Sequence, residues 1–179
     1  MHIALLACLA VLLTTCVDGA DDKLTAYYKR VGAKFLDETS KLPGVNKLPS
    51  GMLFKIDKRG KGEKAPKGDS DCDVHYKGTL KDGTTFDSSY DRGSPATFKP
   101  TQVIKGWTEA LQLMSEGDKW TVYIPYDIAY GASGSPPKIT PYTPLIFEME
   151  LIKVKGPGKP GADAIAELEK KVGKQYEDM

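Results

Sequence analysis

Several aromatic side chains and a few polar ones recur along residues 76–147 at positions where they could form a binding site. The set is Tyr76, Phe86, Asp87, Phe98, Val103, Ile104, Trp107, Tyr130 and Phe147. Any one of them is more typical of a hydrophobic core. As a group they differ, because Phe86-Asp87 follows a turn, Tyr130 begins a long loop and Phe147 lies on the inward face of a predicted strand. The grouping therefore predicts one concave pocket.

Sites that rely on other chemistry have less support. Downstream of the N-terminal segment the only histidine is His75, which lies on a predicted strand and alternates away from its two neighbours, so we expect a structural role and not general base catalysis. Acidic residues share its strand face but provide no turn to wrap oxygen ligands around a metal ion. They are Asp69, Asp71 and Asp73. The glycines at 131 and 134 precede prolines and not a helix N-terminus, which disfavours a phosphate loop. We therefore expect no metal and no cofactor.

Short alternating runs predict the sheet that must position the pocket. They cover Met52–Asp57, Cys72–Leu80, Lys119–Pro125 and Pro144–Val154. Their period of two is typical of antiparallel strands with one packed face. Between them, residues 105–114 place apolar side chains on one helical stripe that includes Trp107. One short helix packed on a curved sheet predicts an α+β fold for residues 51–155.

Length and charge narrow the classes of partner. The 179 residues allow one domain plus extensions. There are 25 Lys and Arg against 24 Asp and Glu, for a formal net charge of +1. No global field therefore attracts phosphate backbones or anionic membranes, and nucleic acid is not an expected partner.

The first 19 residues are typical of a secretory signal peptide. They run almost without charge and are too short for a comfortable membrane span. Cleavage near Gly19 would leave Cys72 as the only cysteine, so no intramolecular disulfide could form. An uncleaved anchor and a lipoprotein site at Cys16 are the alternatives. Because residues 176–179 are not a retention signal, we expect a secreted or periplasm-like location, with no stable membrane span after signal removal.

Two helices are predicted to flank the domain. Apolar residues at steps of three and four indicate an amphipathic helix over residues 22–40, within an N-terminal extension of residues 20–50. In residues 156–179, glycines and prolines indicate a linker, and a second helix begins at Ala162. This helix has an apolar stripe that either folds back on the domain or meets a partner, including a second copy of the chain. The stripe is Ile165, Leu168, Val172 and Tyr176.

Four motifs resemble, in order and spacing, those of FKBP-type peptidyl-prolyl isomerases. They are Val74–Gly78, Asp82–Ser89, Val103–Trp107 and Ala129–Gly131. The N-terminal helix, the signal segment and the Leu48–Gly51 lead-in resemble the Mip-like branch, named for macrophage infectivity potentiator proteins.

The resemblance implies an antiparallel half-barrel wrapped over the short helix, with Trp107 as the floor of a proline pocket. The implied walls are Tyr76, Phe86, Asp87, Phe98, Val103, Ile104, Tyr130, Ile139 and Phe147. Arg92 matches a family arginine and is expected to pair with Asp87. Prolyl peptides are the implied substrates, and macrolide inhibitors are implied ligands. Ala96 and Lys138 depart from the residues common at the rim of this pocket.

The implied activity is rotation of the bond before proline in folding, secreted or host polypeptides. Rotation needs no nucleophile, because the barrier of roughly 18–20 kcal/mol comes from amide resonance and an apolar cavity disfavours the dipole of the planar amide. We expect Asp87 to orient the turning carbonyl. The Tyr130 hydroxyl and the Ile139 amide are expected to hold substrate carbonyls, and Phe86 and Trp107 complete the catalytic set.

The alternative is a non-catalytic module that holds proline-containing segments or macrolides in the same pocket and uses its helices for protein interaction. The presence of Asp87, Trp107 and Tyr130 together favours the enzyme.

Overall fold

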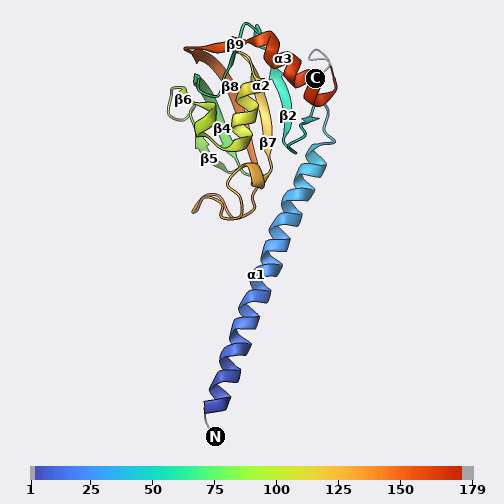
Figure 1. Ribbon diagram of the computed structural model, residues 1–179, viewed down its shortest axis with the longest axis vertical. Coiled ribbons are helices and arrows are strands. Elements are labelled where there is room, and N and C mark those ends of the chain that lie inside the picture. The colour runs from blue at the N-terminus through green and yellow to red at the C-terminus, as the bar shows by residue number, and fades with distance from the viewer. Residues whose placement is uncertain (1–2, 175–179) are drawn as a thin grey trace.

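The computed structural model describes residues 3–174, with side chains from Asp21 onward, and its first element is a long helix. Helix α1 (Ile3–Thr39) projects from the domain, so that only its C-terminal part lies beside the other elements (Figure 1). The predicted helix of residues 22–40 is confirmed but begins much earlier, because the apolar run before it contains no proline and Gly19 does not interrupt it. Among the described residues, no helix combines the length and apolar character needed to cross a membrane.

An antiparallel sheet forms the body of the domain (Figure 1). Its order is β1 (Asn46–Lys47), β2 (Leu53–Lys58), β7 (Lys119–Ile124), β8 (Leu145–Lys155), β4 (Asp71–Thr79) and β5 (Thr85–Ser88), with β6 (Ala96–Phe98) also paired to β4. The path ends at β1 and β5 without closing, which confirms the α+β fold with an open, antiparallel sheet. The four predicted strands are present within a few residues of their expected bounds, and β1, β5 and β6 are additional.

Helix α2 (Lys105–Leu113) packs its apolar face into the core, as its stripe predicts. Trp107, Ala110 and Leu111 are buried there. On β8 the expected alternation is present, because four inward residues are buried while Glu148 is exposed. The inward residues are Leu145, Phe147, Met149 and Leu151. The short helices η1 (Pro100–Gln102) and η2 (Tyr126–Ile128) precede α2 and the long loop before β8.

Cys72 and His75, both on β4, are held by packing and hydrogen bonds outside the binding site. Cys72 is fully buried, and burial, aided by neighbouring carboxylates, raises the pKa of its thiol to about 12. The thiol therefore stays protonated at neutral pH. His75 stacks on Tyr90 with ring centroids 4.5 Å apart, and its Nδ1 lies 2.9 Å from Ser89 Oγ.

The segment after residue 155 belongs to the domain, which corrects the prediction of a free linker. Strand β9 (Gly158–Pro160) pairs antiparallel with β3 (Lys64–Pro66), and helix α3 (Gly161–Val172) follows directly. A Cβ on Gly161 would lie 1.9 Å from the carbonyl oxygen of Gly62. This glycine therefore permits close backbone approach, where composition alone indicated flexibility.

Helix α3 folds back on the domain, the first of the two alternatives left open by its stripe. Leu168 is fully buried in the core cluster, Val172 packs against that cluster and Ile165 is half-buried. Tyr176 lies outside the described residues. Most of the apolar surface expected to support self-association is therefore covered within one chain.

Candidate active site

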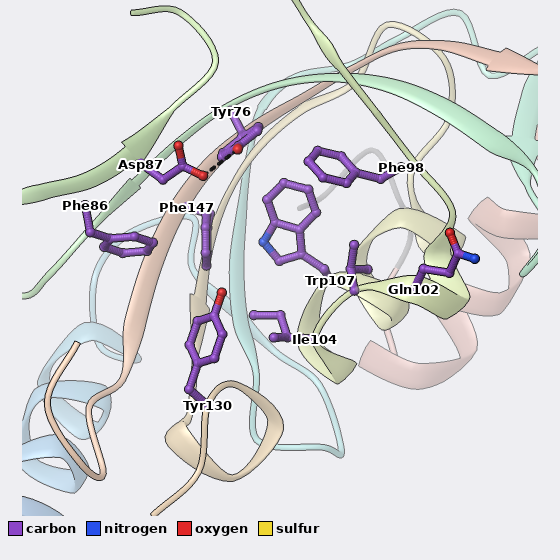
Figure 2. Close-up of a pocket in the computed structure, with 10 residues that line it drawn as sticks. Tyr76, Phe86, Asp87, Phe98, Gln102, Ile104, Trp107, Tyr130 and Phe147 are labelled. Atoms are coloured by element: carbon purple, nitrogen blue, oxygen red, sulfur yellow. Dashed lines mark hydrogen bonds between the residues drawn. The ribbon is translucent and has the colours of Figure 1, made fainter. Parts of the chain in front are cut away.

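A cavity of about 430 Å³ opens between the start of α2 and the strands β4, β5, β6 and β8 (Figure 2). Its lining side chains are Tyr76, Phe86, Asp87, Phe98, Gln102, Val103, Ile104, Trp107, Tyr130 and Phe147. The whole aromatic and polar grouping picked out in the sequence lies here, although its members come from four strands, the start of α2 and the loop after η2. The fold therefore gathers them into one mainly apolar site.

Trp107 lies at the centre of this cavity with 4% of its surface exposed. Its ring meets those of Tyr76, Phe98 and Phe147 edge to face, with centroids 5.0, 5.3 and 5.2 Å apart. Within the described part of the chain its Nε1 hydrogen has no oxygen or nitrogen acceptor, and the indole nitrogen lies on the side of the ring facing Phe147 (Figure 2). Edge-to-face contacts stabilise such clusters, so the floor is a well-packed, uncharged aromatic surface.

A polar cluster stands at the edge of the cavity. The Tyr76 hydroxyl donates to Asp87 Oδ2 at 2.6 Å, and Arg92 Nη2 donates to the Tyr76 oxygen at 2.7 Å. Asp87 Oδ1 accepts from Arg92 Nη1 and, at 2.9 Å, from the Ser88 N–H. The expected contact between Arg92 and Asp87 is thus present, while Arg92 itself does not line the cavity.

These contacts favour the ionised form of Asp87. Burial raises the pKa of this carboxyl, but hydrogen bonds from Tyr76 and Arg92, with the charge of Arg92, lower it by more, so that the pKa lies below its ordinary value. Burial, and then the hydrogen bond to Asp87, raise the pKa of the Tyr76 phenol. At neutral pH the edge of the cavity therefore has an ionised carboxylate, paired with Arg92, beside a protonated phenol, an arrangement that can orient a dipole.

Two residues of the site were missed in the sequence. A Cβ on Gly78 would lie 2.5 Å from the Phe86 ring and 2.8 Å from the Phe147 ring. Only glycine at this position of β4 lets those two rings meet edge to face, 5.4 Å apart, as one wall. A glycine inside a strand is a recognisable sign of close approach, so this signal was available. For Gln102, at the end of η1, no sequence feature indicated a place in the site.

The loop between η2 and β8 supplies Tyr130 but not Ile139. Tyr130 is 41% exposed and its hydroxyl points toward the cavity (Figure 2). Ile139 does not line the cavity, and its N–H donates to the Ser135 carbonyl at 3.0 Å. The expectation that this amide holds a substrate carbonyl is therefore wrong, because the donor is already used. Lys138 Nζ donates to the Phe86 carbonyl at 2.7 Å, so this rim residue ties the loop to β5.

Comparison with known proteins places this geometry in a family. Residues 62–152 match the family model described as FKBP-type peptidyl-prolyl cis-trans isomerase. The macrophage infectivity potentiator of Trypanosoma cruzi is 47% identical over 182 residues, which cover 100% of this chain and 93% of that protein. The outer membrane protein MIP of Legionella longbeachae is 49% identical over 71% of this chain, but only 54% of its own length is matched.

Solved structures agree with the sequence matches. The crystal structure of FkpA from Escherichia coli superposes with a TM-score of 0.71 at 35% identity, covering 88% of this chain and 71% of that chain. A peptidyl-prolyl cis-trans isomerase from Pseudomonas syringae superposes with a TM-score of 0.69 at 40% identity, covering 74% of this chain and 96% of that chain. The chain therefore belongs to the FKBP-type peptidyl-prolyl cis-trans isomerase family, in its Mip-like branch.

Proposed function

We propose that this isomerase seats the proline ring of a polypeptide on Trp107 and that Asp87, Tyr130 and the start of α2 guide rotation of the preceding bond. The observation that supports the proposal most is the combination of an apolar cavity with an ionised carboxylate at its edge. A proline ring is apolar and would replace water there, while the carboxylate and nearby donors would orient the flanking carbonyls.

The cavity suits this reaction because rotation removes a dipole without breaking a bond. Resonance gives the planar amide its charge separation and most of its barrier of roughly 18–20 kcal/mol. An apolar, water-excluding site favours the twisted amide relative to the planar one. A thousandfold acceleration needs about 4 kcal/mol, which desolvation and one or two directed hydrogen bonds of about 1 kcal/mol each can supply.

Wild-type protein is expected to accelerate cis to trans relaxation of a short Xaa-Pro peptide, and Tyr130→Phe to lower kcat/KM about 3- to 10-fold. The phenylalanine keeps the ring but removes a hydroxyl that points into the cavity, at a cost of about one hydrogen bond. Equal relaxation rates with and without wild-type protein would support the non-catalytic binding module instead. Full activity in Tyr130→Phe would contradict only the role of the hydroxyl.

The start of α2 is the best replacement for the amide donor wrongly assigned to Ile139. The first N–H groups of a helix lack intrahelical acceptors. Ile104, which caps α2, lines the cavity, and no acceptor for its N–H is present among residues 3–174. We therefore assign the Ile104 N–H to a substrate carbonyl.

Ile104→Pro is expected to lower kcat/KM about 3- to 10-fold beyond the effect of Ile104→Ala, because both lose the side chain but only proline loses the N–H. The backbone already suits proline, with φ −59° at Ile104 and an extended Val103 before it. Peptide isomerisation compares the two variants, with far-ultraviolet circular dichroism as the folding control. If the two variants are equally active, the amide has no such role.

We also propose that the same cavity binds macrolides. Two residues near it, Ala96 and Lys138, differ from those common in the family. Ala96, on β6, stands where the family often has an aromatic ring. Lys138 places an ammonium on the Phe86 carbonyl. Both features bear on which macrolides fit.

We further propose that residues 1–19 direct export and that the domain works in a secreted or periplasm-like compartment. Support comes from the almost uncharged first 17 residues and from the name of the Legionella relative, an outer membrane protein. The catalytic domain of residues 51–155 would then act with β9 and α3 packed on it, and residues 20–50 would form an N-terminal extension. Its partners would be prolyl polypeptides in that compartment.

A further inference from the structure

The backbone of Tyr142 has an unusual conformation with a consequence for the active-site loop. Among the described residues it is the one non-glycine with positive φ, at 55°. Such a conformation is unfavourable for a residue with a side chain and persists where the surroundings impose it. The Tyr142 N–H donates to the Gly131 carbonyl at 3.1 Å, and the Gly131 N–H donates to the Tyr126 carbonyl at 2.7 Å. The backbone of Gly131, the residue after Tyr130, is therefore held between Tyr126 and Tyr142.

Helix α1 supplies contacts that hold Tyr142 in place. Lys29 Nζ lies 4.8 Å from the centre of the Tyr142 ring, and the same ring meets the Tyr126 ring edge to face at 5.3 Å. Gly32 is buried and lets the helix approach the loop, since a Cβ there would lie 3.2 Å from Pro144 Cδ and 3.5 Å from the Tyr142 carbonyl oxygen. Tyr142 and Pro144 are thus in contact with α1 at two positions one turn apart, Lys29 and Gly32.

The middle of the loop is held by Lys138, whose Nζ donates to the Phe86 carbonyl, and by Ile139, which is buried in the core cluster. Within the described chain, the only β-bridge outside named strands is the pairing of Ser135 with Ile139, in the middle of the loop. The segment after that bridge returns along α1, where Tyr28 and Leu24 line a small cavity of about 170 Å³ together with Pro141 and Tyr142. Helix α1 therefore supports the last part of the loop, from Pro141 to Pro144.

We propose that α1 positions Tyr130 over the active site, acting through Lys29, Gly32 and Tyr142. The inference rests on the proposed role of the Tyr130 hydroxyl. None of these three residues lines the cavity, so they are positioning residues and not catalytic ones. All three remain in the chain if the first 19 residues are removed, so the support does not depend on signal cleavage.

Gly32→Leu in the full chain tests the proposal, with Ala26→Leu as the matched control. A Cβ at residue 32 already lies 3.2 Å from Pro144 Cδ, so we expect the larger leucine to push α1 away from Tyr142. Ala26 is exposed on the same helix, so the same side chain there contacts solvent. Leucine favours helix at both sites. Lys29→Gln is a second, milder variant that removes the ammonium over Tyr142 without adding bulk.

Amide hydrogen exchange measured by NMR reports the loop independently of activity. The Gly131 and Tyr142 amides are expected to exchange about tenfold faster in Gly32→Leu and about threefold faster in Lys29→Gln, because local opening becomes easier. Ala26→Leu is expected to leave both rates unchanged. Unchanged exchange in Gly32→Leu and Lys29→Gln overturns the proposal.

A double-mutant cycle with Tyr130→Phe separates positioning from general damage. Gly32→Leu is expected to lower kcat/KM about fivefold when Tyr130 is present and less than twofold in the Tyr130→Phe background. An equal loss in both backgrounds overturns the proposal. If Gly32→Leu fails to fold, Lys29→Gln takes its place in the cycle, and its loss of kcat/KM is again expected to be larger when Tyr130 is present.

Failure of this inference can be told from failure of the proposed role of Tyr130. Wild-type activity in Tyr130→Phe alone removes that role, and the inference falls with it. A loss in Tyr130→Phe without any effect of Gly32→Leu or Lys29→Gln overturns the positioning by α1 and leaves the role of Tyr130 standing.

Discussion

Asp87→Ala is expected to lower kcat/KM for a short Xaa-Pro peptide about 10- to 100-fold, equivalent to about 1.4–2.8 kcal/mol of transition-state stabilisation. The carboxylate is held at the edge of the cavity by Tyr76 and Arg92. A carboxylate that is already held in position can act on a carbonyl that turns beside it without reorganisation during the reaction. The measurement is cis to trans relaxation followed across peptide concentrations.

The change should act on catalysis far more than on folding. The Asp87 side chain is 44% exposed, so its ion pair with Arg92 is screened by solvent and contributes little to stability. Asp91→Ala is the matched control, because Asp91 is an exposed carboxylate on the turn that follows β5 and does not line the cavity. It is expected to keep kcat/KM within about twofold of wild type. More than half of wild-type activity in Asp87→Ala would exclude the proposed electrostatic role.

The pH dependence of this group follows from the direction of its pKa shift. Because folding lowers the pKa of Asp87, its ionised form stabilises the fold above the unfolded pKa of about 3.9, and that contribution is lost as pH falls through the lower folded value. Activity that depends on the Asp87 carboxylate is therefore expected to show no titration of this group near neutral pH.

How much of the fold could be predicted depends on the length of each element. Strands of six or more residues, such as β4 and β8, show alternation that sequence reveals. Strands β1, β6 and β9 have two or three residues, which is too short for any period. Strand β9 also contains Gly and Pro, and its pairing with β3 depends on a distant segment of the chain. Composition alone therefore described it as a linker.

The site could be predicted where its residues lie in contiguous motifs and not where it depends on loop geometry. Asp87, Trp107 and Tyr130 lie within short motifs, and all three line the cavity. The orientation of the Ile139 amide is set by its hydrogen bond to the Ser135 carbonyl, which no sequence pattern predicts. The conformation of Tyr142 is equally hidden, because a tyrosine gives no reason to expect positive φ. The contact of Tyr142 with α1 joins residues far apart in the sequence, so it could be found only from the structure.

Trp107→Leu is expected to lower kcat/KM at least about tenfold and the free energy of unfolding by about 2–5 kcal/mol. The floor would shrink and three edge-to-face contacts would be lost. Loss of activity from a destabilised fold must be separated from loss of the floor itself. Urea unfolding gives the stability, and activity is measured at a temperature where the variant remains folded.

Trp120→Leu provides that separation, because the two tryptophans share burial but not position. Trp120 is fully buried on β7, stacks on Phe54 with centroids 4.8 Å apart and does not line the cavity. Its replacement is expected to cost a similar free energy of unfolding, about 2–5 kcal/mol, yet to keep kcat/KM within about threefold while the chain is folded. If both variants instead lose activity in proportion to their stability, packing alone explains the effect. If only Trp107→Leu loses it, the indole acts as the surface on which the proline ring turns.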